Sequence, residues 1–238
     1  MYSGNIVGYT KLNLAAGKMD MKGMQFIKVV DATPLNIQSI EPVLGFNDEG
    51  GDTIRFWSPS TLKYTTATYY LESYDDQGEE ELGPGWVDDY LTRLTNSVPA
   101  GKGFWFETLN NASYIVAAQV IEAEDNTIVL VGGKMDIVCN PFPAEILIQD
   151  IKPVSGFNDE GGDTIRFWNP STLKYTTATY YLESYDDQGE EELGPGWVDD
   201  YLTRLTNSIP VGNSFWFETL ANAVYECTPP AALTEETP

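Results

Sequence analysis

The stretch GFNDEGGDTIRFW, Gly45 to Trp57, recurs letter for letter as Gly156 to Trp168. Working outward from it, the match covers Gly45–Leu109 and Gly156–Leu220, where a shift of 111 residues aligns 65 positions and leaves five differences. The differences are Ser58/Asn169, Val98/Ile209, Ala100/Val211, Lys102/Asn213 and Gly103/Ser214. The chain of 238 residues is therefore a tandem duplication whose unit has the size of a domain.

The flanks of this repeat have drifted apart but can still be aligned. Gly17–Asp20 matches Gly133–Asp136 at a shift of 116, so the first copy carries five additional residues between the two anchors. The acidic segment 121–126 lacks a β pattern, which favours a boundary there. We predict a first β domain over residues 1–120, a second over 121–228, and a tail over 229–238.

Strand signals dominate each copy. Thr53–Trp57 is rich in β-formers, the next residues favour a turn, and Lys63–Leu71 resumes the two-residue alternation of a strand, which predicts a hairpin. The segments 34–43 and 143–154 permit one short helix each. The expected fold is mainly β, with two tandem homologous domains that are either β-sandwiches or small barrels.

The formal net charge is −23, and most of it lies in the two copies, which carry −8 and −9. Such a surface repels phosphate backbones, so nucleic acid is not expected as a partner, whereas cations and basic partners are. No stretch has the ~18 apolar residues of a membrane-spanning helix, so membrane insertion is not expected. Histidine is absent, which removes the commonest general base, and we predict that the chain is not an enzyme.

Two acidic loops of identical sequence are candidate cation sites. Clustered carboxylates beside a glycine suit Ca²⁺, which binds six to eight oxygens, although the spacing matches no EF-hand. A solvated acidic loop is the alternative, and no other cofactor is expected. The candidate ligands are Asp75, Asp76 and Glu79 in the first copy and Asp186, Asp187 and Glu190 in the second.

Aromatic residues suggest a second kind of site. Trp86 and its equivalent Trp197 each lie between a glycine and an acidic pair, so we expect these two rings to be exposed and able to stack on a sugar. Other tryptophans, such as the one in Gly103–Phe106, are expected in the core. Glycans are therefore candidate partners.

The two cysteines, Cys139 and Cys227, both lie in the second half. We predict a disulfide between them if the protein is exported, with two buried free thiols as the alternative. The start of the chain lacks the pattern of a signal peptide, which suits either a cytosolic protein or a mature exported form. Composition favours the second, at the cell surface or outside the cell.

Short aromatic motifs carry a family resemblance. Asn5–Tyr9, Asp163–Pro170, Gly196–Trp197 and Pro210–Phe217 together resemble modules of uncharacterised exported bacterial proteins. The resemblance implies export and a β fold, and no activity is attached to it.

The duplication without a catalytic set favours a structural role. Our leading prediction is a secreted subunit whose β edges pair with other copies of itself to build an extracellular filament or surface layer. The alternative is a bivalent carbohydrate-binding or adhesive module, which could depend on calcium. An enzyme with paired carboxylates ranks third.

Overall fold

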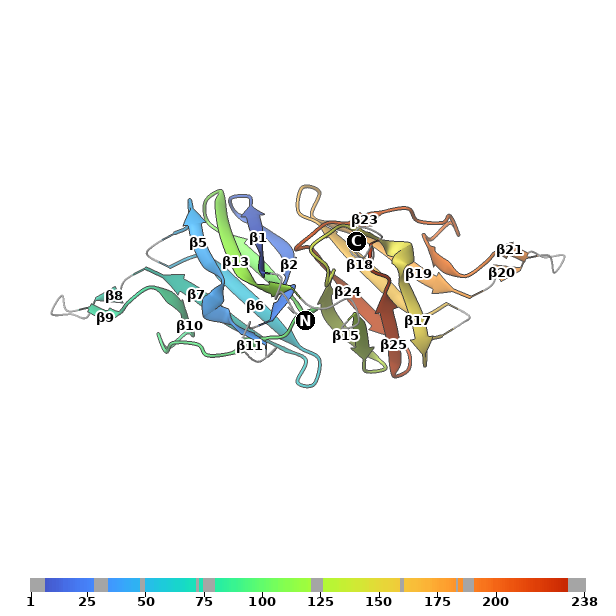
Figure 1. The fold of residues 1–238 in the computed structure, drawn as a ribbon, viewed down its shortest axis with the longest axis horizontal. Helices are drawn as coiled ribbons and strands as arrows, with labels where there is room; N and C mark the ends of the chain where they lie inside the picture. Colours follow the sequence, from blue (N-terminus) through green and yellow to red (C-terminus); the bar gives the residue numbers. More distant parts are fainter. Residues whose placement is uncertain are drawn as a thin grey trace, which may run out of the picture.

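A computed structural model of the chain describes residues 7–27, 34–47, 50–71, 73–74, 80–120, 126–158, 161–182, 184–185 and 191–230. Within these ranges the fold is mainly β, as predicted. The first half, up to residue 120, and the second half, from residue 126, lie side by side along the long axis of the molecule (Figure 1). Residues 121–125 of the predicted boundary segment and 231–238 of the predicted tail lie outside the described residues.

The strands of the two halves follow the same order, except that β3 of the first half has no counterpart in the second. Those of the first half are β1 (Val7–Leu14), β2 (Lys18–Gly23), β3 (Phe26–Ile27), β4 (Leu35–Asn36), β5 (Glu41–Leu44), β6 (Thr53–Ser58), β7 (Lys63–Tyr70), β8 (Ser73–Tyr74), β9 (Glu80–Leu82), β10 (Gly85–Val87), β11 (Ser97–Val98), β12 (Gly103–Thr108) and β13 (Ala112–Val120). Those of the second half are β14 (Thr127–Leu130), β15 (Lys134–Cys139), β16 (Ile146–Leu147), β17 (Ile151–Ser155), β18 (Thr164–Asn169), β19 (Lys174–Tyr181), β20 (Ser184–Tyr185), β21 (Glu191–Leu193), β22 (Gly196–Val198), β23 (Ser208–Ile209), β24 (Ser214–Thr219) and β25 (Ala223–Cys227).

Local sequence signals explain the hairpin and the short helix. Strands β6 and β7 pair in antiparallel register from Thr53↔Thr68 to Ser58↔Lys63, which confirms the predicted hairpin. The expected helix is a single 3-10 turn in each half, η1 (Ile37–Ser39) and η2 (Ile148–Asp150). In η1 the side chain of Asn36 accepts a hydrogen bond from the backbone N–H of Gln38, which caps the turn.

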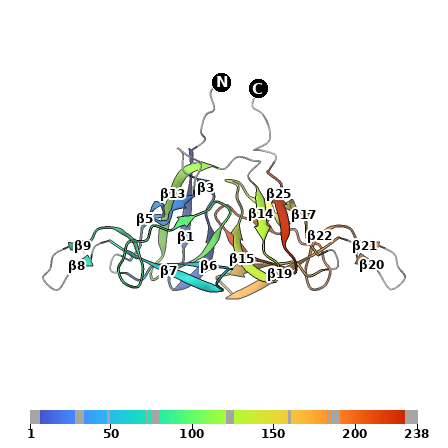
Figure 2. The ribbon, with the colours of Figure 1, turned by 90° about the horizontal axis from the view of Figure 1, so that it is seen from below.

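Four larger sheets, two from each half, build the molecule. In the first half they are β10-β7-β6-β12-β2 and β1-β13-β3, with β5 also paired to β13. In the second half the corresponding sheets are β15-β24-β18-β19-β22 and β14-β25-β17. The short ribbons β8–β9 and β20–β21 project from the two opposite ends of the molecule (Figures 1 and 2).

Each half has its own apolar core, and the two cores have equivalent members. Ile54, Phe104 and Tyr114 belong to the first core, and Ile165, Phe215 and Tyr225 to the second. A third cluster crosses between the halves and consists of Met21, Trp105, Ile137 and Trp216, with Met19, Trp57, Met135 and Trp168 packed against it. Because this cluster joins the halves, the sheets form a propeller-like arrangement that does not divide into two clear sandwiches.

The third cluster relates the halves by an approximate twofold axis. The rings of Trp57 and Trp216 lie 5.6 Å apart at 80°, and those of Trp168 and Trp105, their equivalents, lie 5.5 Å apart at 81°. Edge-to-face contacts of this kind are the preferred geometry for aromatic pairs. In these ring contacts, each half therefore uses equivalent tryptophans.

Candidate functional site

The turn after β10 is closed by one carboxylate. The side-chain Oδ1 of Asp88 accepts hydrogen bonds from the backbone N–H groups of Tyr90 at 2.9 Å and Thr92 at 2.8 Å. The backbone N–H of Asp88 donates to the carbonyl oxygen of Thr92, and that of Leu91 donates to the carbonyl oxygen of Asp88, both at 3.0 Å. A bridge between Val87 and Arg93 completes the loop. We call residues 88–93 the aromatic turn of the first half.

This turn displays apolar side chains to solvent. Tyr90 is 89% exposed and Leu91 is 38% exposed. Leu91 has φ of 59°, a left-handed conformation that costs a leucine roughly 1–2 kcal/mol. The hydrogen bonds to Asp88 hold the backbone in this strained form. Backbone strain at Leu91, next to the exposed ring of Tyr90, motivates a functional hypothesis.

The second half repeats the aromatic turn over residues 199–204. Asp199 Oδ1 accepts the N–H groups of Tyr201 at 2.9 Å and Thr203 at 2.8 Å. Tyr201 is 88% exposed, and Leu202 has φ of 60°. The molecule thus has one exposed tyrosine on a hydrogen-bonded turn in each half.

The base of the turn is anchored to the body of the protein. The side-chain amide of Gln38 donates to the carbonyl oxygens of Trp86 at 2.7 Å and Leu94 at 2.8 Å, and its Oε1 accepts the backbone N–H of Trp86 at 2.9 Å. The guanidinium of Arg93 donates to the carbonyl oxygens of Gly83 and Pro84. Gly85 has φ of 150°, and a Cβ at this position would collide with Arg93. The glycine is therefore required for the guanidinium to lie where it does.

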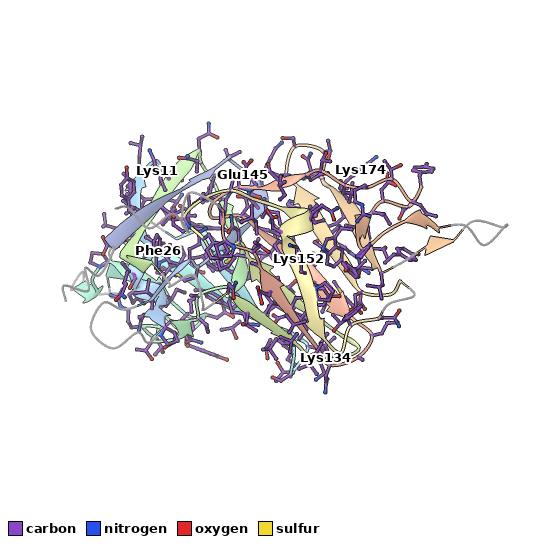
Figure 3. The ribbon with its side chains drawn as sticks, turned by 45° about the vertical axis from the view of Figure 1, so that its right-hand side comes forward. Lys11, Phe26, Lys134, Glu145, Lys152 and Lys174 are labelled. Carbon is purple, nitrogen blue, oxygen red and sulfur yellow. The ribbon has the colours of Figure 1, made fainter. Side chains whose placement is uncertain are left out.

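A groove of about 460 Å³ lies beside this base and is lined in part by Gln38, Glu41, Phe46 and Tyr69. The pKa of Tyr69 is raised above its ordinary value, mainly because the phenol is partly buried. The positive charge of Arg93 opposes this shift, and the negative charge of Glu41 adds to it. At the position of Glu41 the second half has Lys152, on β17 (Figure 3). The two halves therefore place opposite charges at this equivalent position.

Trp86 and Trp197, which sequence reasoning placed in an exposed sugar-binding position, are both fully buried. Their indole N–H groups donate to the carbonyl oxygens of Ile40 at 2.8 Å and Ile151 at 2.7 Å. Their expected exposure is wrong, because β10 and β22 turn these side chains into the aromatic cores. The exposed aromatic residue lies four positions further along the chain, at Tyr90 and Tyr201.

Cys139 and Cys227 are both free, so the predicted disulfide is not formed in the structure. The two thiols lie in different surroundings. Cys139 is at the contact between the halves, where its Sγ donates to the carbonyl oxygen of Met24 at 3.2 Å, and Cys227 belongs to the core of the second half. Burial raises the pKa of both thiols, that of Cys227 to about 12.

The six candidate calcium ligands, at positions 75, 76, 79, 186, 187 and 190, lie outside the described residues. Within the described ranges, no group of three or more His, Cys, Asp or Glu side chains is arranged to hold a metal ion. Asp52, the residue before β6, is buried. Its carboxylate accepts hydrogen bonds from the Tyr114 hydroxyl at 2.7 Å and from the backbone N–H groups of Asn47 and Leu109. Asp163 binds Tyr225 in the same way. These two carboxylates stabilise the fold.

No family model, curated protein or solved structure matches the chain. None of the helices in the described residues is long and apolar enough to span a membrane.

Proposed function

We propose that the chain is a bivalent carbohydrate-binding or adhesive module, with one binding turn in each half. The observation that supports it is the pair Tyr90 and Tyr201, which are 89% and 88% exposed on identical, hydrogen-bonded turns. The proposal takes each half as one β domain of sandwich or small-barrel type, acting outside the cell.

The chemistry of each turn suits a sugar ring. A phenol face can stack on the apolar face of a pyranose, and Tyr loses little conformational entropy on binding because only two torsions become fixed. Asp89 and Asp200, which precede the two tyrosines, are exposed carboxylates able to accept hydrogen bonds from sugar hydroxyls. The fixed backbone reduces the ordering cost of binding.

The duplication explains how a small contact could be effective. One exposed tyrosine with its neighbours buries far less area than a stable protein interface needs. Two linked copies raise the apparent affinity for a repetitive ligand by about 10²–10⁴, provided both sites engage together. A polysaccharide, which repeats its units, is the ligand class that benefits.

Immobilised polysaccharides test this proposal. Wild type should bind, Y90A and Y201A should each lose about tenfold or more through lost avidity, and the double variant should not bind. Y9A is the matched control, because Tyr9 is also exposed, at 73%, but lies on β1 outside the turns. If wild type binds no glycan on a broad array, or if the double variant binds like wild type, the proposal is wrong.

The structural subunit remains a second candidate, and the edge strand β14 favours it. Its outward-facing Val129 is 67% exposed, and Val131, just beyond it, is 51% exposed. An exposed apolar edge is a surface on which another copy could add a strand. Negative-stain microscopy and sedimentation over a range of concentrations would test this, with V129K expected to abolish any filament. Monomers at every concentration would contradict it.

A further inference from the structure

The interface between the halves brings equivalent residues face to face. In the first half Gly103 pairs with Gly23 across β12 and β2, and in the second half Ser214 pairs with Cys139 across β24 and β15. The shift of 116 makes Gly23 the equivalent of Cys139, and the shift of 111 makes Gly103 the equivalent of Ser214. The four positions therefore surround the approximate twofold axis.

At this axis only one of the two halves supplies a side chain. A Cβ on Gly23 would lie 2.0 Å from the Cβ of Cys139, and a Cβ on Gly103 would lie 2.5 Å from the Cβ of Ser214. Real Cβ atoms do not approach this closely, so each contact needs a glycine opposite the larger residue. The backbones meet here through Gly23 N–H to Gly212 O at 3.0 Å and Cys139 N–H to Gly101 O at 2.9 Å.

The two halves also differ in where the lysines at their contact lie. On one side of the axis, Lys102 of the first half forms an ion pair with Asp136 of the second, whose side chain is only 9% exposed. On the equivalent side, Asp20 is paired at 2.7 Å with Lys22, which also donates to Asn213 at 3.2 Å. Each carboxylate thus has one lysine, but the lysines come from non-equivalent positions, because Asn213 replaces Lys102 and Val138 replaces Lys22.

We propose that the inner faces of the halves are complementary recognition surfaces, so that the first half accepts a second half, of this chain or of another copy, and neither accepts its own kind. A pair of second halves would set Cys139 against Cys139 and leave each Asp136 without a lysine. A pair of first halves would leave voids at the glycines and bring two lysines to each Asp20. A nearly buried carboxylate without a cation and a collision of side chains are each strongly unfavourable.

Sequence differences between the two copies occur at this contact. Four of the five differences in the repeat lie between positions 98 and 103 and their equivalents. Lys102/Asn213 and Gly103/Ser214 lie at the axis, whereas Val98 and Ile209 belong to the separate cores of the two halves. The remaining difference, Ser58/Asn169, lies at the ends of β6 and β18, where the hairpin turns begin, and Asn169 Oδ1 accepts the backbone N–H of Ser171 at 2.9 Å. Exchanging residues between the copies should therefore lower the stability of the fold at the axis and leave it unchanged at this hairpin turn.

Thermal unfolding of the full chain under reducing conditions tests the proposal. G23C should lower Tm by roughly 3–10 °C through overpacking, C139G should lower it by leaving a void, and G23C with C139G should lie closer to wild type than either single variant. S58N, the matched exchange in the turn, should change Tm by less than about 1 °C. If G23C is as stable as wild type, or if the double variant loses as much as both single variants together, the proposal is overturned.

The charged pair gives a second test that does not depend on packing at the glycines. K102N should lower Tm by roughly 2 °C or more, and adding D136N should recover most of that loss, because no unpaired carboxylate remains. N213K should also lower Tm, since it adds a second lysine beside Lys22 and Asp20. No loss in K102N, or none in N213K, would contradict the division of charge.

Discussion

The indole N–H of Trp57 donates to the carbonyl oxygen of Met135, 2.7 Å away in the opposite half of the molecule. Trp168 makes the equivalent bond to Met19 at 2.8 Å. A fully apolar contact would specify alignment poorly, whereas these two bonds fix how one half is placed on the other. The tryptophans thus contribute to the shape of the assembly as well as to its buried area.

Replacing either of these tryptophans should have the same effect. W57F and W168F each remove one hydrogen bond to a main-chain carbonyl and part of an aromatic contact, so each should reduce the free energy of unfolding by about 1–3 kcal/mol. Urea denaturation followed by circular dichroism measures this. Losses that differ by more than about 1 kcal/mol would show that the two contacts are not energetically equivalent.

The aromatic turns should separate stability from binding. L91G removes the left-handed strain of Leu91, so it should leave Tm unchanged or raise it, while loosening the turn and weakening glycan binding. D88A removes the acceptor for two backbone N–H groups and should cost about 1 kcal/mol. Calorimetry gives the stability, and the immobilised polysaccharide assay gives the binding. Glycan binding by L91G as tight as that of wild type would mean that the strain has no binding role.

Stability should fall in alkaline solution because of Tyr114 and Tyr225. Burial, and then the hydrogen bonds to Asp52 and Asp163, hold the pKa of both phenols well above the ordinary value of about 10. The folded state therefore keeps protons that the unfolded state releases above pH 10, and each phenol lowers stability by up to about 1.4 kcal/mol per pH unit there.

Urea titrations at pH 8 to 11 measure this dependence. Y114F and Y225F should each be less stable at pH 8, because each leaves a buried carboxylate with one donor fewer. Each should also show a smaller alkaline slope, and the double variant a smaller slope still. An alkaline slope in the double variant equal to that of wild type would assign the effect to other groups.

The sequence predicted the elements of the fold better than it predicted their arrangement. The two-residue alternation in Lys63–Leu71 identified the hairpin because a strand's period is a local property. The contact between the halves was not predicted, because it joins residues far apart in the sequence: Trp57 bonds to Met135, and Met19 accepts a bond from Trp168. A glycine before Trp86 and an acidic pair after Val87 favour a surface position, yet β10 pairs with β7 and directs the Trp86 indole into the core. The sequence Asp-Asp-Tyr-Leu-Thr held a turn signal, an acidic residue two positions before Tyr90, that could have identified the exposed aromatic.

The thiols of Cys139 and Cys227 should be inert in the folded protein. Both are fully buried, and burial raises the pKa of Cys227 to about 12, so the reactive thiolate is scarce at pH 8. A thiol reagent such as iodoacetamide should label neither residue in native buffer and both in guanidinium chloride, each step being followed by intact mass. The unlabelled protein should have the mass of two free thiols. A mass lower by two hydrogen atoms would show a disulfide. Gly23 and Met24 of the opposite half cover the Cys139 thiol. Fast labelling of Cys139 without denaturant would therefore show that the contact between the halves opens readily.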